Sequence, residues 1–191
     1  MLRAIRHLIR LRRDDRGSPA IEFGLAAPVL VTIVVGTMEF GMLMFVDILM
    51  ESALRDAARW GITGQLPNGQ SRMAYIVDLI DERTLGLVDM SEANIQVLTY
   101  PAYDLVGKGE SFVDGNGNGA YDAGETYTDT NGNGAWDQDM GVSGAGNADS
   151  VVVYRITYDW PLLTPIAGAF IGHDGKYRLR AAIAVKNEPW D

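Results

Sequence analysis

The chain has 191 residues, with 16 Lys and Arg, 25 Asp and Glu and a formal net charge of −9 at pH 7. This length suits one small domain with an appendage, and the absence of cysteine excludes disulfides, a thiol nucleophile and a cysteine-based zinc site. Six arginines and two aspartates precede Ser18, so the rest of the chain holds 10 basic and 23 acidic residues. This excess of acidic residues argues against nucleic acid as a partner. It favours a chain that keeps its basic end in the cytoplasm and exports the rest.

Residues 1–17 form a short arginine-rich leader, and a long apolar run follows. No charge occurs from Phe23 to Met38 and, apart from Glu39, the apolar character continues to Val46. The run to Val46 is long enough to cross a hydrocarbon core of about 30 Å with some tilt. Basic residues before it and almost none just after predict a single-pass helix with its N-terminus in the cytoplasm. The alternative, a buried helix of a soluble protein, does not explain the charge asymmetry.

Apolar periodicity predicts that the same helix continues past the membrane to Gly61, with Ala53, Leu54, Ala57, Ala58 and Trp60 along one stripe. A second amphipathic helix is expected over 71–84, with an apolar face of Met73, Ile76, Val77 and Ile80. Strands are expected at 95–100, 151–160 and 177–187.

These elements predict an α+β protein in which a long N-terminal transmembrane helix leads to a small periplasmic domain with an antiparallel sheet and a calcium-binding loop insertion. The expected organisation is a basic leader at 1–17, a transmembrane N-terminal helix at 18–61, and an exported α+β domain at 62–191 with the insertion at 109–140.

The insertion contains a 15-residue repeat, GESFVDGNGNGAYDA followed by GETYTDTNGNGAWDQ. The first copy has the ligand spacing of a twelve-residue EF-hand-type loop, with a turn at Gly119 and a carboxylate at the twelfth position. Calcium prefers such oxygen ligands, so we expect a site formed by Asp114, Asn116, Asn118, the Ala120 carbonyl, Asp122 and Glu125.

The second copy repeats most of this register but ends differently. It supplies Asp129, Asn131, Asn133, the Ala135 carbonyl and Asp137. Its twelfth position is Met140, which has no oxygen ligand, so we expect Asp139, or Glu125 or Glu110 from the neighbouring copy, to replace it. A hairpin of Asn-Gly turns is the alternative. It does not explain the twelve-residue register or the absence of Lys and Arg from 109 to 154.

No helices flank the loops, so we expect calcium to order the inserted segment rather than to trigger opening of a groove. Sites with dissociation constants of about 10⁻⁴–10⁻³ M would fill outside the cell. Calcium would then do the ordering that disulfides do in other exported domains.

The stretch RGSPAIEFGLAAPVL resembles a type IV prepilin processing site. Together with ALRDAARWG and the terminal AAIAVKNEPW, it resembles the TadE-like family of minor pilins (pseudopilins) of the tight-adherence (Tad/Flp) pilus. The resemblance implies cleavage between Gly17 and Ser18 by a membrane prepilin peptidase. It also implies assembly with other pilin subunits and the pilus machinery through the helix that carries Glu22 and Phe23, in the bacterial inner membrane.

In pilins the glutamate at the position of Glu22 is thought to neutralise the terminal amine of a neighbouring subunit. A carboxylate in lipid costs about 2.5–3.5 kcal/mol, so Glu22 is expected to seek a cation; snorkelling to the interface is the alternative. Glu39 lies deeper in the apolar run, and the sequence leaves open whether it is protonated or faces a partner subunit.

We expect no enzymatic activity. His7 and His173 are the only histidines, and His173-Asp174 reads as a hairpin turn rather than a catalytic dyad. The rival to the pilin interpretation is a permanently anchored calcium-dependent adhesion or ligand-binding module that never enters a pilus. The N-terminus of the mature chain separates the two.

Overall fold

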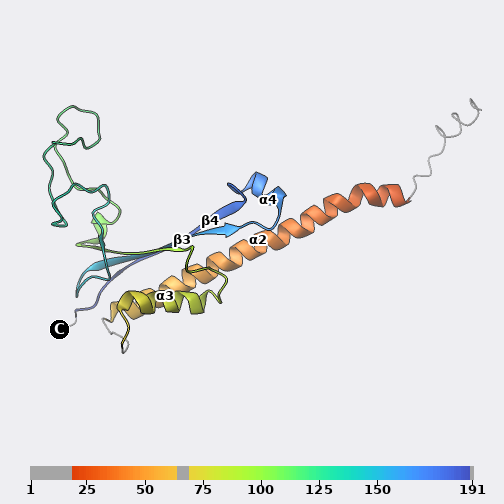
Figure 1. Ribbon diagram of the computed structural model, residues 1–191, viewed down its shortest axis with the longest axis horizontal. Coiled ribbons are helices and arrows are strands. Elements are labelled where there is room, and N and C mark those ends of the chain that lie inside the picture. Colours follow the sequence, from red (N-terminus) through yellow and green to blue (C-terminus); the bar gives the residue numbers. More distant parts are fainter. Residues whose placement is uncertain (1–18, 64–68, 190–191) are drawn as a thin grey trace, which may run out of the picture. The chain divides into compact units, whose positions relative to one another are not determined.

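The computed structural model describes residues 19–63 and 69–189, and it divides the chain into two compact units, Met1–Met42 and Leu43–Asp191. The elements after the long helix α2 (Pro19–Ile62) are α3 (Arg72–Arg83), β1 (Asn94–Tyr100), the 3₁₀ turn η1 (Tyr103–Leu105), β2 (Val142–Ser143), β3 (Val151–Pro161), α4 (Pro165–Phe170) and β4 (Lys176–Lys186) (Figure 1). The predicted order of a long apolar helix followed by a small antiparallel sheet is confirmed.

The helix α2 is continuous over 44 residues, although Pro28 lies inside it. It is the one helix in the described part of the chain that is long and apolar enough to cross a membrane. In the first unit large apolar side chains lie on its surface, with Phe23 70% exposed and Leu25 74% exposed. Water disfavours such a surface and a bilayer favours it.

The sheet has the strand order β2-β1-β3-β4, and every neighbouring pair is antiparallel. The register joins Asn94 to Thr157 and Tyr100 to Val151, while Val151 also faces Lys186. The end of β1, the start of β3 and the end of β4 therefore lie together at one end of the sheet. The chain between β3 and β4, which includes α4, forms the other end.

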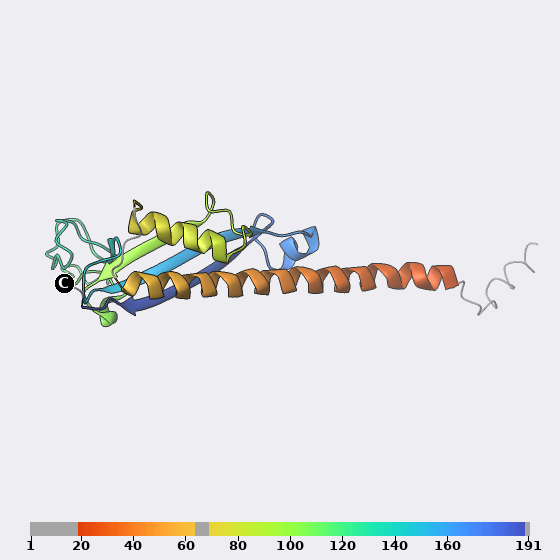
Figure 2. The same cartoon turned by 90° about the horizontal axis from the view of Figure 1, so that it is seen from below.

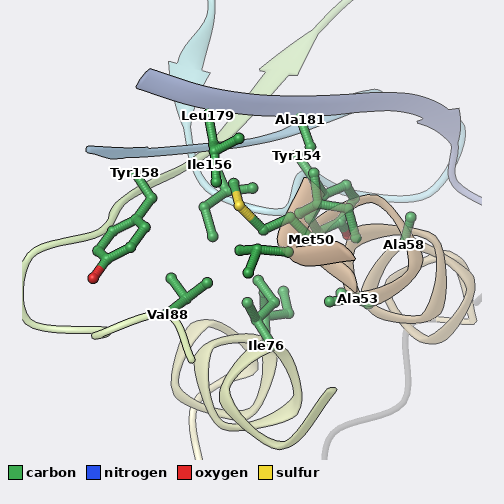
Figure 3. Packing of buried hydrophobic residues seen from close by; sticks show 14 of the residues in the cluster. Met50, Ala53, Ala58, Ile76, Val88, Tyr154, Ile156, Tyr158, Leu179 and Ala181 are labelled. Atoms are coloured by element: carbon green, nitrogen blue, oxygen red, sulfur yellow. The ribbon is translucent and has the colours of Figure 1, made fainter. Parts of the chain in front are cut away.

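Within the second unit, α3 and the C-terminal part of α2 cover one face of the sheet (Figure 2). Met50, Ala53 and Ala58 of α2 and Ile76 of α3 point toward Tyr154, Ile156 and Leu179 of the sheet (Figure 3). The predicted stripe of α2 is confirmed for its alanines and Leu54, which are at most 1% exposed, whereas Trp60 is only half-buried. The close approach of α2 to the sheet requires small residues: a Cβ on Gly61 would overlap the Tyr154 hydroxyl.

Helix α3 begins where Ser71 accepts a hydrogen bond from the Ala74 N–H (3.1 Å), the usual N-cap arrangement. Ile76 and Ile80 are fully buried, as predicted, but Met73 is 42% exposed. The prediction for Met73 is therefore wrong. Helix α3 buries the narrow stripe that faces α2 and the sheet, and Met73 lies outside that stripe.

The opposite face of the sheet is partly covered by a second, smaller apolar cluster. It consists of Tyr100, Met140, Val151 and Val153, with Leu98, Leu105 and Val106 packed against it. Met140 is the last residue of the predicted second calcium loop, so the loop insertion is joined to the sheet through this cluster. The two-residue strand β2, which follows Met140, was not predicted.

Candidate calcium loops and the N-terminal segment

The insertion projects from the end of the sheet where β1 ends and β3 begins (Figure 1). Its two repeats pair with each other through an antiparallel bridge between Phe112 and Tyr127. The Val113 N–H donates to the Thr126 carbonyl and the Thr128 N–H to the Ser111 carbonyl, both at 2.8 Å. The equivalent residues Phe112 and Tyr127 therefore face each other at the centre of the pairing, and the repeats are related by a local two-fold arrangement.

In the first loop, the Asp114 carboxylate gathers backbone N–H groups. One oxygen accepts from Gly117 (2.6 Å) and Asn118 (3.2 Å), and the other from Gly119 (2.8 Å). These donors, the Gly119 N–H above all, hold the pKa of Asp114 below its ordinary value. The loop bends sharply at Gly119, where φ is 77°, a value that residues with a Cβ rarely adopt.

The other polar side chains of the first loop meet at Asp122. The amides of Asn116 and Asn118 donate to the same Asp122 oxygen at 2.6 and 2.8 Å. Their own carbonyl oxygens accept from the N–H groups of Asn118 (3.0 Å) and Ala120 (2.7 Å). Side chains at positions one, three, five and nine of the register thus belong to one hydrogen-bonded network.

Glu125 closes the first loop from the twelfth position. Its two carboxylate oxygens accept from the Gly115 N–H (2.8 Å) and the Asp122 N–H (3.0 Å), which are the second and ninth residues of the loop. The carboxylate therefore spans the loop opening, as a bidentate twelfth ligand must.

The second loop repeats the same network. Asp129 accepts from Gly132 (2.6 Å), Asn133 (3.1 Å) and Gly134 (2.9 Å). The amides of Asn131 and Asn133 donate to one Asp137 oxygen at 2.7 and 2.6 Å, and the Asn133 carbonyl oxygen accepts from Ala135 (2.7 Å). Each bond has its counterpart 15 residues earlier.

Glu110 occupies the twelfth-position role in the second loop. Its carboxylate accepts from the Thr130 N–H (2.6 Å) at one oxygen and from the Asp137 N–H (3.3 Å) at the other. Thr130 and Asp137 are the second and ninth residues of the second loop, so Glu110 repeats what Glu125 does in the first. Glu110 is also only 2% exposed. Of the three alternatives for this position, the geometry favours Glu110.

The sequence contained a signal for this role. Glu110 and Glu125 both follow the glycine that opens a repeat, so the repeat makes them equivalent. Glu125 closes the loop that precedes it, whereas Glu110 reaches the second loop only because the two repeats pair.

Asp139 is bound to the sheet instead. Its carboxylate accepts from the Tyr100 hydroxyl at 2.7 Å and from the Gly141 N–H at 3.2 Å. Burial and the neighbouring Asp139 carboxylate raise the pKa of Tyr100 to about 12. The hydrogen bond joins the end of the second loop to the small apolar cluster of the sheet.

Four aromatic side chains connect the two loops. Tyr121 and Trp136, at equivalent positions of the repeats, stack with ring centroids 4.6 Å apart. Phe112 meets both rings edge-on at 5.8 Å, and Tyr127 meets Tyr121 at 5.7 Å. The Trp136 indole N–H also donates to the Glu110 carbonyl at 2.9 Å. The two loops therefore form one packed unit.

The donor set of each loop fits a hard cation. Carboxylate, amide and backbone carbonyl oxygens are what calcium takes, and no Lys or Arg lies between 109 and 154. Within residues 19–63 and 69–189, however, no three His, Asp or Glu side chains cluster closely enough to hold a metal ion by themselves. Calcium coordination in these loops stays a prediction.

The predicted processing residues, Gly17 and Ser18, lie outside the described residues. Glu22 lies in the first turn of α2, with Phe23 beside it, and both are exposed. Glu39, farther along α2, is buried, with 2% of its surface exposed.

The histidine motif forms the predicted tight turn. His173 and Lys176 form an antiparallel bridge, and Asp174 and Gly175 between them have positive φ values of 51° and 72°. The side chains of His173 and Asp174 are at least 90% exposed, 3.5 Å apart. The preceding helix α4, which Thr164 caps by accepting from the Ala167 N–H (3.1 Å), was not predicted.

In a comparison with known proteins, residues 17–59 match the family model described as TadE-like protein. Neither the curated proteins nor the solved structures contain a match to the chain. The matched stretch begins at the predicted processing site and ends in the last turn of α2; the terminal AAIAVKNEPW lies outside it. The resemblance to the TadE-like family is thus confirmed for the N-terminal helix, and the chain carries a TadE-like segment there.

Proposed function

We propose that the chain is a membrane-anchored minor pilin (pseudopilin) that takes part in assembly of a Tad/Flp-type pilus. The observation that carries the proposal is the TadE-like match over residues 17–59, which covers most of α2. Such a subunit requires an apolar N-terminal helix followed by a small α+β domain, because the helix both anchors the precursor in the membrane and packs against other helices in the pilus.

The proposed location is the bacterial inner membrane, in a single pass with the C-terminal domain in the periplasm or in the pilus. The six arginines before Ser18 support this orientation, since basic residues flanking a span stay in the cytoplasm. Cleavage by a prepilin peptidase between Gly17 and Ser18 would remove these arginines and leave the anchor in place.

The mature N-terminus tests the proposal. Mass spectrometry of the protein isolated from its native host should find a chain that begins at Ser18 and is present in sheared pili. A chain that retains Met1 in those cells would contradict the pilin function and favour a permanently anchored adhesion module.

Glu22 is the proposed assembly residue. The change Glu22→Gln should leave cleavage at Gly17 intact but deplete the protein from pili, because the amide no longer neutralises a neighbouring terminal amine. Glu51→Gln is the matched control: Glu51 lies on the same helix but contacts Arg55 (3.3 Å) beyond the apolar run. Equal depletion by both variants would remove the assigned role of Glu22.

In this proposal the two loops bind calcium and so stabilise the insertion. Residues 109–140 contain seven acidic residues and no basic one, so their mutual repulsion opposes the folded loop. A divalent cation in each loop would offset that repulsion and be coordinated by the oxygen atoms at the ligand positions of the twelve-residue loop.

Calorimetry on the full chain in detergent micelles tests the calcium sites. We expect two calcium ions per chain at millimolar calcium. Glu125→Gln should remove binding to the first loop and Glu110→Gln binding to the second, while Asp139→Asn should keep both. No uptake by the unaltered chain would remove the calcium role; loss of a site in Asp139→Asn but not in Glu110→Gln would reverse the assignment of the closing carboxylate.

A further inference from the structure

The connection between β3 and β4 exposes apolar side chains at the end of the sheet opposite to the calcium loops. Phe170 is 85% exposed, Leu163 71% and Ile171 46%. Single exposed apolar residues are ordinary, but three within nine residues on one connection form a local apolar surface. We refer to Leu163, Phe170 and Ile171 as the apolar tip.

The tip lies on the side from which α2 enters the domain. Gly61, near the end of α2, lies against Tyr154, and the Ile62 carbonyl accepts from the Glu188 N–H at 3.2 Å. From Tyr154, β3 runs back along α2 to Pro161. At a strand rise of about 3.3 Å per residue, the distance from Tyr154 to Pro161 is about 23 Å. The same length of α-helix contains about 15 residues. Pro161 is thus level with about Val46, near the start of the part of α2 that belongs to this unit.

Basic residues flank the tip. Lys176, Arg178 and Arg180 follow it on β4, and they are three of the 10 basic residues after the leader. Arg178 is held by Asp159, with two hydrogen bonds of 2.7 and 2.9 Å. Lys176 and Arg180 are exposed and, among the described residues, take part in no ion pair. Tyr177, between them, is 38% exposed.

Exposed apolar side chains with basic residues and a tyrosine beside them match an anionic lipid surface better than a protein surface. Apolar side chains enter the border of the acyl region, Lys and Arg remain at the headgroups, and Tyr is enriched at that level. The rest of the exported part is strongly acidic and would be repelled by anionic lipid. Around the tip Lys176, Arg178 and Arg180 outnumber Asp159 and Asp174, so this end gives the domain one face that such lipid attracts.

We propose that the apolar tip, with Lys176 and Arg180 beside it, inserts into the outer surface of the anionic bilayer in which α2 is anchored. The inference rests on the membrane anchor of the proposed function. It adds a second contact with lipid, which holds the domain against the membrane before the subunit leaves it.

The absence of cysteine makes the test direct, because one introduced thiol can be labelled. Phe170→Cys, labelled with an environment-sensitive fluorophore, is reconstituted as the full chain into vesicles of phosphatidylglycerol and phosphatidylcholine. Lipids with nitroxides at defined depths then report its position. The label should be quenched from about 5–10 Å below the headgroups.

Two further labels separate the possible failures. Val31→Cys, on the apolar part of α2, reports the anchor, and Val113→Cys, 66% exposed on the insertion, reports water. If Val31 is quenched while Phe170 behaves like Val113, the tip proposal is overturned and the anchor stands. If Val31 is also unquenched, both are overturned.

Charge and dilution identify what the tip contacts. The double change Lys176→Gln and Arg180→Gln should reduce quenching at Phe170 in anionic vesicles, whereas Lys186→Gln, at the far end of β4, should not. Diluting the protein in lipid should leave the quenching unchanged. Loss on dilution would show that a second copy of the chain covers the tip, and would overturn the lipid assignment.

Discussion

The helix–sheet core and the inserted loops of the exported unit are held together by different forces. In the core, Met50, Ile76, Ile80 and Ile156 are completely removed from water, and apolar burial supplies the stability. In the loops, carboxylates and amides hydrogen-bond to backbone N–H groups, and most of the side chains lie at the surface. The core therefore depends on shape and volume, and the loops on charge and on what neutralises it.

The loops show how a protein without cysteine can carry a long insertion. Connections of more than about 15 residues without their own structure are uncommon. This one has an internal two-fold arrangement, four packed aromatic rings and two carboxylates that close the loops. It behaves as a small structure attached to the sheet at Tyr100 and Met140, so changes in one region should leave the other largely intact.

The largest expected effect is a cavity in the core. Ile80→Ala should lower the free energy of unfolding by about 2–5 kcal/mol, since Ile80 is fully buried between α3 and its neighbours. Met73→Ala is the matched control on the same helix, and we expect a cost below about 1 kcal/mol because Met73 is 42% exposed. Denaturant unfolding of the full chain in micelles measures both. Equal losses of unfolding free energy in the two variants would contradict the structure, because Met73 would then have to be as buried as Ile80.

That comparison also shows what the sequence could predict. The helices, the three long strands and the loop register were predictable because they rest on local periodicity and spacing. The exposure of Met73 was not, because a helix's apolar face is wider than the stripe that its partner covers. Helix α4 and β2, with six and two residues, are too short for a periodic signal.

The closing carboxylate of the second loop was only partly predictable. The repeat marked Glu110 and Glu125 as equivalent, but the chain order placed Glu110 before both loops. Its position depends on the pairing of Phe112 with Tyr127, which is a tertiary contact. Likewise, nothing local in the sequence indicated that Asp139 would accept a hydrogen bond from Tyr100, 39 residues earlier.

The next effect is expected at the junction of the two regions. Tyr100→Phe removes a hydrogen bond to a carboxylate, which should cost about 1.5–3 kcal/mol. The pKa of Tyr100 is raised in the folded state to about 12 from an ordinary value near 10. The protonated hydroxyl therefore stabilises the fold fully below pH 10, and this contribution is lost as pH rises toward 12. The pKa values of Tyr127 and Tyr154 are also raised by burial, so ultraviolet titration of tyrosinate should find one fewer late-titrating group in Tyr100→Phe than in the unaltered chain.

Calcium removal should affect the loops more than the core. With a dissociation constant of about 10⁻⁴ M, 1 mM calcium would stabilise each loop by about 1.4 kcal/mol. Chelation should therefore speed proteolysis between 109 and 140 while helical content stays nearly constant. Limited proteolysis followed by mass spectrometry, with circular dichroism on the same sample, measures both. Cleavage that appears first in α3 after chelation would contradict the separation of the two regions.

The most local effect is expected within one loop. Gly119 has a φ of 77° and no atom within 4 Å of a Cβ added to it, so Gly119→Ala introduces backbone strain without a steric clash. That strain costs about 1–2 kcal/mol, which corresponds to a roughly tenfold loss of calcium affinity in the first loop. Gly115→Ala is the control: its Cβ would lie an ordinary 3.6 Å from the Glu125 carboxylate, and its φ is outside the left-handed region. Calorimetry should find the second loop weakened less than the first. Equal weakening of both loops would mean that the aromatic cluster transmits the strain, and that the two loops bind calcium as one site pair rather than as two separate sites.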